Sequence, residues 1–182
     1  MLAASAEMLD EGLDVGLRAV ARRAGVSPAA PYRHFADKEA LLSAAALEGF
    51  DALRAALVAV DEGAPIERVR ALGVAYVVFA AEHPGWFRLM FSDQLERARH
   101  PALVRASRPP FSLLAAAIRE AVARGQLRGD PRDLTRMAWS LVHGVAHLVL
   151  GGQGRGAGID EEDVAGTAAR VIDTALVGAT RA

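Results

Sequence analysis

Apolar residues recur through most of this chain at intervals of three and four positions, which is the spacing of one face of an α-helix. Alanine, leucine, arginine and glutamate, which favour helices, dominate the same segments. The alternation typical of a half-buried strand is approached most closely in residues 74–79, and this stretch lies inside a longer helical pattern. The pattern therefore predicts an all-α fold of about nine helices.

Glycine, proline and capping residues predict where these helices begin and end. Ser27 is expected to cap a short helix, and Asp130 to open a long one. Pro109 and Pro110 are expected to disturb the seventh helix, and the glycine-rich residues 151–158 to form a flexible connector. The expected helices cover residues 1–10, 17–24, 28–35, 38–60, 66–82, 86–91, 101–124, 132–150 and 160–177.

Composition limits the classes of protein that fit this pattern. Of 182 residues, 52% are hydrophobic and 24% are charged, which is enough for a packed core. The absence of cysteine excludes disulfides, a thiolate nucleophile and cysteine-bound zinc. The sequence has neither an apolar run of about 18 residues nor a signal-peptide pattern, so we expect no membrane span and a cytoplasmic protein. Because no nucleophile–base–acid set is visible, we predict no enzyme activity and no cofactor.

Positive charge is concentrated in residues 17–38, although the formal net charge of the whole chain is −1. A local basic patch on an otherwise acidic chain suits a protein that contacts nucleic-acid phosphates through one surface. Against the single acid Asp37, this segment holds five basic residues: Arg18, Arg22, Arg23, Arg33 and Lys38.

The same segment has the pattern of a helix-turn-helix, two short helices joined by a turn that begins with glycine. Gly25 permits the positive φ that the turn requires, and the small Ala21 lets the two helices cross closely. Val26, Pro31 and Phe35 are expected on the inward side of the second helix. The residues left to face a DNA groove are Ala29, Ala30, Arg33, His34 and the hydroxyl end of Tyr32.

Two motifs resemble those of a known family. Residues 21–42, ARRAGVSPAAPYRHFADKEALL, resemble the DNA-binding signature of the TetR family. The later pattern Trp139-x-x-x-His143-Gly144 resembles a motif carried by one subgroup of that family. The likeness is strong over residues 1 to about 50 and weak over the rest, apart from this second motif.

The resemblance implies a ligand-responsive, sequence-specific DNA-binding transcriptional regulator. Residues 1–46 would form a three-helix helix-turn-helix DNA-binding domain, and residues 47–182 a helical effector-binding and dimerisation domain. It also implies a repressor that releases a palindromic operator in double-stranded DNA when a small molecule binds. The implied contacts are Tyr32 and His34 to the DNA backbone, Lys38 to a phosphate, Arg18 to a phosphate or base, and Ala29, Ala30 and Arg33 to the bases.

The chain departs from the family pattern in two places. Gly16 stands where members usually have a serine or threonine at the start of the second helix, so one cap and one backbone contact are weakened. Members also often carry a basic arm before the first helix. We expect such an arm to precede the printed sequence, which begins inside that helix.

The last two predicted helices are the candidate dimer interface. One helix-turn-helix domain contacts too few base pairs for tight specific binding. Proteins of this kind usually bind as two-fold symmetric dimers, so we expect a homodimer. The alternative is that both apolar stripes are buried within one chain. The stripes are Leu134, Leu141, Val145 and Leu148 on one helix and Val164, Ala168, Val171, Ile172 and Ala175 on the other.

Aromatic residues cluster after residue 75, the composition usual for a largely apolar small-molecule pocket, although for any single residue ordinary core packing is the better interpretation. His143 and His147 are spaced like two metal ligands, but no third ligand is near in sequence, so no metal is predicted. The alternative function is a helical small-molecule-binding protein without a DNA function. The expected ligand contacts are Tyr76, Trp86, Phe87, Met90, Phe91, Phe111, Trp139, His143 and His147.

Overall fold

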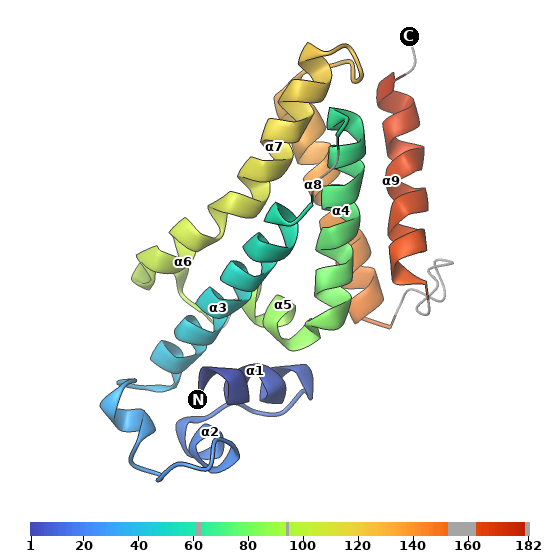
Figure 1. Cartoon of the computed structure of the whole chain (residues 1–182). Coiled ribbons are helices and arrows are strands. Elements are labelled where there is room, and N and C mark those ends of the chain that lie inside the picture. Colours follow the sequence, from blue (N-terminus) through green and yellow to red (C-terminus); the bar gives the residue numbers. More distant parts are fainter. Residues whose placement is uncertain (61–62, 94, 153–162, 181–182) are drawn as a thin grey trace. The chain divides into compact units, whose positions relative to one another are not determined.

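The structure, a computed structural model, describes residues 1–60, 63–93, 95–152 and 163–180 (Figure 1). Within these ranges every regular element is a helix, which confirms the predicted all-α class. The α-helices are α1 (Leu2–Asp10), α2 (Leu17–Arg23), α3 (Lys38–Val58), α4 (Pro65–Glu82), α5 (Pro84–Met90), α6 (Pro101–Ala106), α7 (Arg108–Ala123), α8 (Pro131–Leu150) and α9 (Val164–Thr180), and the 3-10 helices are η1 (Pro31–Arg33) and η2 (Arg97–Arg99).

Several predicted helix ends are confirmed together with their physical cause. Asp130 caps α8, because its carboxylate accepts a hydrogen bond of 2.7 Å from the backbone N–H of Arg132. Gly25, which follows α2, has a φ of +66°, the left-handed conformation that ends helices and favours glycine. Gly16 precedes α2 without a side-chain cap, as the sequence indicated. The predicted connector 151–158 and the start of the last predicted helix at 160 lie largely outside the described residues.

The predicted α-helix over residues 28–35 is wrong, because only η1 is helical there and it is a single 3-10 turn. Pro31 has no N–H, so it cannot make the α-helical hydrogen bond to the carbonyl of Ser27. The N–H of Ala30 bonds to that carbonyl instead, at 2.9 Å, in a tighter three-residue pattern. Ser27 therefore closes a turn and caps no helix.

Side-chain burial in this segment agrees only in part with the sequence. Pro31 is buried and Phe35 is half-buried, as expected for the inward side of the motif. Val26 was expected to face inward, but it is 40% exposed. The prediction fails because Val26 follows Gly25 in the turn and lies on no helix.

The predicted helix over residues 101–124 is broken into α6 and α7 at Ser107. Pro109 and Pro110 do not disturb α7, because they lie in its first turn, where backbone N–H groups have no partner within the helix. The prolines therefore open a new helix. The sequence pattern also missed η2, which precedes α6.

Contacts within the chain divide it into two compact units. The first consists of Met1–Ala52 and His83–Ser107, and the second of Leu53–Glu82 and Arg108–Ala182. The segment that contains α5 and α6 thus belongs with the N-terminal helices. The predicted boundary at residue 46 divides the chain by function, whereas the two units are defined by contacts. That boundary therefore stays a prediction.

In the first unit, α5 packs closely against α1. The N–H of Gly85 donates a hydrogen bond of 2.9 Å to the Asp10 carboxylate. A β-carbon at Gly85 would lie 1.9 Å from the backbone carbon of Leu9, so only glycine fits at this crossing. The core of this unit includes Phe50 and Phe87, which are 2% and 0% exposed.

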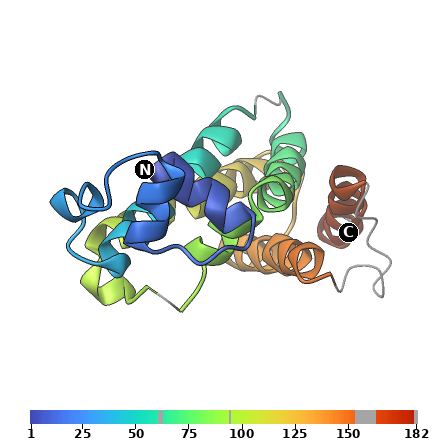
Figure 2. The ribbon, with the colours of Figure 1, turned by 90° about the horizontal axis from the view of Figure 1, so that it is seen from below.

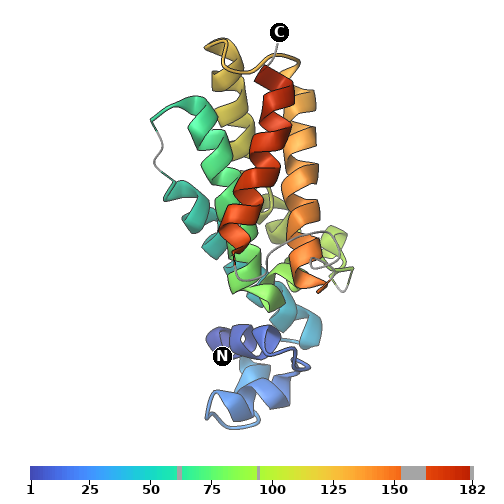
Figure 3. The ribbon, with the colours of Figure 1, turned by 90° about the vertical axis from the view of Figure 1, so that its right-hand side faces the viewer.

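In the second unit, α4 and α8 pack against each other, with α7 and α9 on either side (Figures 2 and 3). Gly73 of α4 allows a close approach, since a β-carbon there would lie 2.7 Å from the Ile172 side chain of α9. Val77 and Ala146 are fully buried between these helices. None of the helices in the described part of the chain has the length and apolar character needed to cross a membrane.

Candidate nucleic-acid interface and effector site

The residues predicted to contact DNA lie at the surface of the first unit. Arg18 is on α2, Tyr32 and Arg33 are in η1, and Lys38 is the first residue of α3. Their side chains are exposed, with Tyr32 at 52%. The remaining predicted contacts are the exposed Ala29 and His34 and the half-buried Ala30.

Two of the basic side chains in this region are already paired with acids. Lys38 Nζ lies 2.6 Å from the Asp14 carboxylate. Arg23 forms a two-pronged ion pair with Glu11 and a further contact of 3.3 Å with Glu7. The hydrogen bond from Arg23 lowers the pKa of Glu11 and raises the pKa of the guanidinium. The Arg23 contacts connect α2 to α1 and its C-terminal cap. The Lys38 contact connects the start of α3 to the loop that follows α1.

The remaining basic side chains of the segment have no acidic partner among the described residues. Arg18, Arg22 and Arg33 make no ion pair within the described ranges. Arg22 was counted in the basic patch but was not predicted as a DNA contact. Its exposed position on α2 adds it to the candidate interface, and the local charge count was the signal that pointed to it.

Five of the nine predicted ligand contacts come together in the second unit. Trp139 is central, with ring centroids 5.2 Å from Tyr76, 5.7 Å from Phe111 and 6.0 Å from His143. The indole and the His143 ring are nearly parallel, at 11°, as expected for residues one helical turn apart on α8. His147 continues the row, 4.6 Å from His143.

A hydrogen-bonded chain leads from the buried interior to the surface of this cluster. The Tyr76 hydroxyl lies 2.8 Å from Nδ1 of His143, and Nε2 of His143 lies 3.2 Å from Nε2 of His147. Burial raises the pKa of Tyr76, so its hydroxyl keeps its proton. Burial, and after it the electrostatic interaction with His147, lowers the pKa of His143. His143 is therefore neutral at pH 7 and can donate one hydrogen bond and accept another.

The space inside this cluster is small in the described conformation. The cavity lined by Tyr76, Trp139 and Pro110 has a volume of about 10 Å³, and sites for drug-sized ligands occupy roughly 300–1,000 Å³. A second cavity between α4, α8 and α9 has about 20 Å³. An effector would have to displace side chains to enter either one.

The other four predicted ligand contacts lie in the first unit. Phe87 and Met90 are buried there, and the Phe91 ring lies 4.8 Å from Phe87 and 5.8 Å from Phe50. Nε1 of Trp86 is buried and has no hydrogen-bond partner within the described residues. Five of the nine predicted contacts thus belong to the second unit and four to the first, and the assignment of all nine to an effector site stays a prediction.

Metal ligation finds little support in the geometry. In the part of the chain that the structure describes, no three histidine, aspartate or glutamate side chains come together to hold an ion. His143 and His147 contact each other, but they have no third ligand among those residues.

Comparison with known protein families gives two matches. Residues 1–45 match the family described as bacterial regulatory proteins, tetR family. Residues 69–175 match the tetracyclin repressor-like C-terminal domain. A search of the curated proteins gives no match.

Solved structures share the fold over nearly the whole chain. A protein of unknown function from Rhodococcus sp. RHA1 is 34% identical, with a TM-score of 0.81 over 99% of this chain and 93% of that one. A putative TetR-family transcriptional regulator from Rhodococcus sp. is 24% identical, with a TM-score of 0.74 over 96% and 95%. The regulator FadR from Bacillus subtilis, solved with stearoyl-CoA, is 15% identical, with a TM-score of 0.77 over 97% and 96%.

Proposed function

We propose that this chain, which belongs to the tetR family of bacterial regulatory proteins, is a ligand-responsive, sequence-specific DNA-binding transcriptional regulator that acts as a repressor. The observation that carries the proposal is the surface formed by α2, η1 and the first turn of α3. It presents three cations without an internal partner in the described residues, Arg18, Arg22 and Arg33, beside the exposed Tyr32. The proposal includes no catalytic role.

Each side chain of this surface is given a role by its chemistry. Arg33, on the short η1, has five fixed donors and reads a base edge, while Lys38 and Arg18 neutralise phosphates. Tyr32 and His34 position the head through the DNA backbone. Ala29 and Ala30 present small apolar surfaces that fit against a thymine methyl group.

The spacing of the operator half-sites follows from the two-fold symmetry of a dimer. Two heads in successive major grooves on one face of the duplex require half-sites about one helical turn, or roughly 34–36 Å, apart. The DNA partner is therefore a palindromic double-stranded operator, and the protein acts as a homodimer in the cytoplasm, where bacterial DNA lies.

We assign the dimer contact to the outward parts of α8 and α9. Val145, Ala168 and Ile172, which belong to the predicted stripes, are already buried within the single chain. Leu141 and Val171 remain half-buried, and Val177 is 44% exposed. A second copy would cover these side chains.

The effector is a small, largely apolar molecule that binds around Trp139. Because the adjoining cavity has only about 10 Å³, binding selects a conformation in which the Tyr76 and Trp139 rings separate. We propose α3 as the lever, since this one helix begins at the DNA-contacting Lys38 and ends at Val58. The effector acts only as far as it binds the two conformations with different affinity.

The Trp139-x-x-x-His143-Gly144 pattern supports membership of the subgroup that carries this motif. In that assignment His143 orients the effector through one hydrogen bond, and the surrounding rings supply most of the affinity.

An electrophoretic shift with the promoter beside the protein's own gene tests the function. The wild type is expected to shift this fragment at nanomolar concentration, and Arg33→Ala to shift it only at higher concentration. Arg105→Ala is the matched control, since Arg105 is an exposed cation of the same unit outside the motif. Ligand-induced stabilisation of a protein that shifts no DNA would favour the alternative, a helical small-molecule-binding protein.

A further inference from the structure

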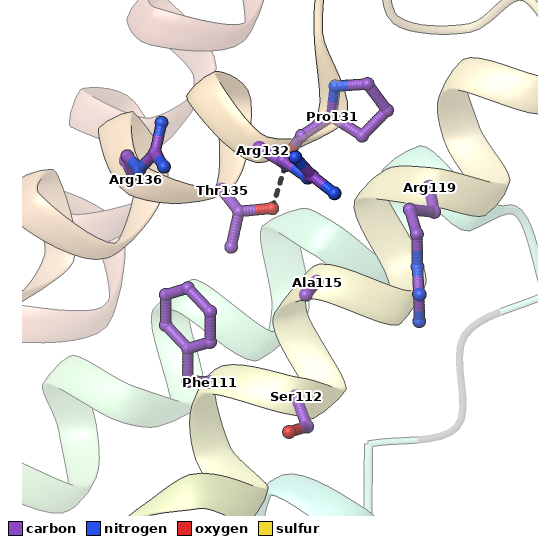
Figure 4. A pocket seen from close by; sticks show the side chains of 8 residues that line it. All are labelled: Phe111, Ser112, Ala115, Arg119, Pro131, Arg132, Thr135 and Arg136. Atoms are coloured by element: carbon purple, nitrogen blue, oxygen red, sulfur yellow. Dashed lines mark hydrogen bonds between the residues drawn. The ribbon is translucent and has the colours of Figure 1, made fainter.

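A groove of about 470 Å³ runs between α7 and α8 in the second unit (Figure 4). Its volume lies within the range typical of small-molecule sites, roughly 300–1,000 Å³, unlike the much smaller cavity beside Tyr76. The residues that line it are Phe111, Ser112, Ala115, Arg119, Pro131, Arg132, Thr135 and Arg136.

One side of the groove is apolar. Phe111 is 39% exposed, and Ala115 lies one turn further along α7. Behind it, the edge of Phe111 packs on Trp139, at a centroid distance of 5.7 Å. Apolar surface therefore continues from the groove toward the interior of the unit.

Three cationic side chains also line the groove. Arg119 comes from α7, while Arg132 and Arg136 come from α8, and no acidic residue lines the groove. Figure 4 shows the Arg132 side chain reaching from the first turn of α8 toward the side of α7 that carries Arg119. Several cations along one groove create a positive potential that attracts an anion.

The nearby acids leave two of these guanidinium groups available. Asp133 pairs with Arg136 at 2.7 Å, and Asp130 accepts a hydrogen bond from a backbone N–H. Within the described ranges, the side chains of Arg119 and Arg132 have neither a hydrogen bond nor an ion pair. Thr135 donates its hydroxyl proton to the Pro131 carbonyl at 2.6 Å, so its methyl group is left for an apolar contact.

We propose that this groove binds an amphiphilic carboxylate, with the carboxylate held by Arg119 and Arg132 and the apolar body lying on Phe111 and Ala115. A guanidinium donates two parallel hydrogen bonds to a carboxylate, which gives orientation as well as affinity. A neutral apolar molecule of the same shape would cover the two arginines without giving their N–H groups an acceptor. The groove is a second site beside the proposed effector site around Trp139, and its binding of a carboxylate does not depend on the proposed function.

Titration calorimetry of the full chain at low salt tests the proposal with 1-naphthoate as the probe. The neutral 1-naphthalenemethanol has the same rings and no charge. We expect naphthoate to bind at least about tenfold more tightly than the alcohol, since hydrogen bonds to a charged group are the stronger kind.

Substitution of the two groove arginines tests where naphthoate binds. Arg119→Gln with Arg132→Gln should weaken naphthoate binding by about tenfold or more and leave the alcohol unaffected. Arg68→Gln is the matched control, because Arg68 is an exposed cation of the same unit outside the groove, and it should bind naphthoate like the wild type. Circular dichroism confirms the fold of each variant, and all three positions are exposed.

Equal affinity for the acid and the alcohol would overturn the proposal, and so would an unchanged affinity in the double variant or an equal loss in Arg68→Gln. The calorimetry contains no DNA, so these outcomes are independent of the regulator assignment. Conversely, a protein that binds no operator but loses naphthoate only in the double variant keeps the groove and loses the proposed function.

Discussion

The ion pair between Lys38 and Asp14 makes the DNA contact of Lys38 quantitatively testable. The two groups lie 2.6 Å apart, with side chains 50% and 86% exposed. Exposed pairs of this kind contribute about 0.2–1 kcal/mol to the free energy of unfolding. If Lys38 must leave Asp14 to hold a phosphate, the same amount opposes DNA binding. Asp14→Asn should therefore tighten operator binding at low salt by up to about fivefold for each chain bound, or up to about 30-fold for a dimer with two such pairs, with little change in stability.

Lys38→Ala should act in the opposite direction on the same equilibrium. It should weaken binding to every DNA sequence and flatten the dependence of log Kd on log salt by about 0.9 units for each chain bound, or about 1.8 for the dimer, because each chain loses one phosphate contact and its released counterion. In the double variant, the gain from Asp14→Asn should disappear, since the interaction it relieves is gone.

Fluorescence anisotropy with a labelled operator, measured over a series of salt concentrations, gives the Kd of the wild type and of each variant, and the salt slope of each. Glu96→Gln is the control for net charge, because Glu96 is an exposed acid of the same unit, 3.8 Å from Arg99. Equal tightening by Glu96→Gln would show a general charge effect. An unchanged salt slope in Lys38→Ala, or a gain from Asp14→Asn that persists in the double variant, would refute the assigned contact.

Three further predictions concern base reading, assembly and pH. Arg33→Ala should relax base preference at one operator position, by about 1–3 kcal/mol if it reads guanine; selection that returns the same operator at the same stringency would leave Arg33 a backbone contact. Leu141→Glu with Val171→Glu should give monomers that keep only weak non-specific DNA binding, as sedimentation and anisotropy would show; a dimer that survives both charges would place the interface elsewhere. Because the pKa of His143 is lowered in the folded chain, its contribution to stability is present above the ordinary histidine pKa of about 6.5 and is lost as pH falls through the folded value. His143→Gln should accordingly lose less thermal stability than the wild type below about pH 6.5, and parallel melting curves for the two proteins would contradict this.

Local signals in the sequence were enough for most helix ends. Gly25 and Asp130 act within one or two residues of their own position, so the turn after α2 and the start of α8 were predictable. The segment around Pro31 failed for a local reason too, because a helical pattern outweighed the missing N–H of a proline in mid-segment. A proline four positions after a potential capping serine is therefore a signal against an α-helix, because it lacks the N–H that would bond to the serine carbonyl.

Contacts between distant residues were not predictable in the same way. The bond from Gly85 to Asp10, which joins α5 to the N-terminal helices, spans 75 positions and leaves no periodic trace. Asp14 was visible as an acid, but nothing in the sequence pairs it with Lys38, 24 residues later. The aromatic residues were predicted as one pocket because composition carries no information about which unit each ring joins.

The arrangement of Trp139, His143 and His147 was predictable in part. Their common face follows from spacing on one helix, and the ring contacts agree with it. The hydrogen bond from the row to Tyr76 depends on the packing of α4 against α8, which spacing does not specify.

The central claim is that two copies of this chain read a palindromic DNA site through the surface around Arg33. Selection of bound fragments from a random pool of duplexes, followed by sedimentation of the complex, tests it most directly. The account predicts a palindrome whose half-sites lie about one helical turn apart, with at least two chains bound per site. Recovery of fragments without a shared sequence, or of one asymmetric site bound by a single chain, would contradict it.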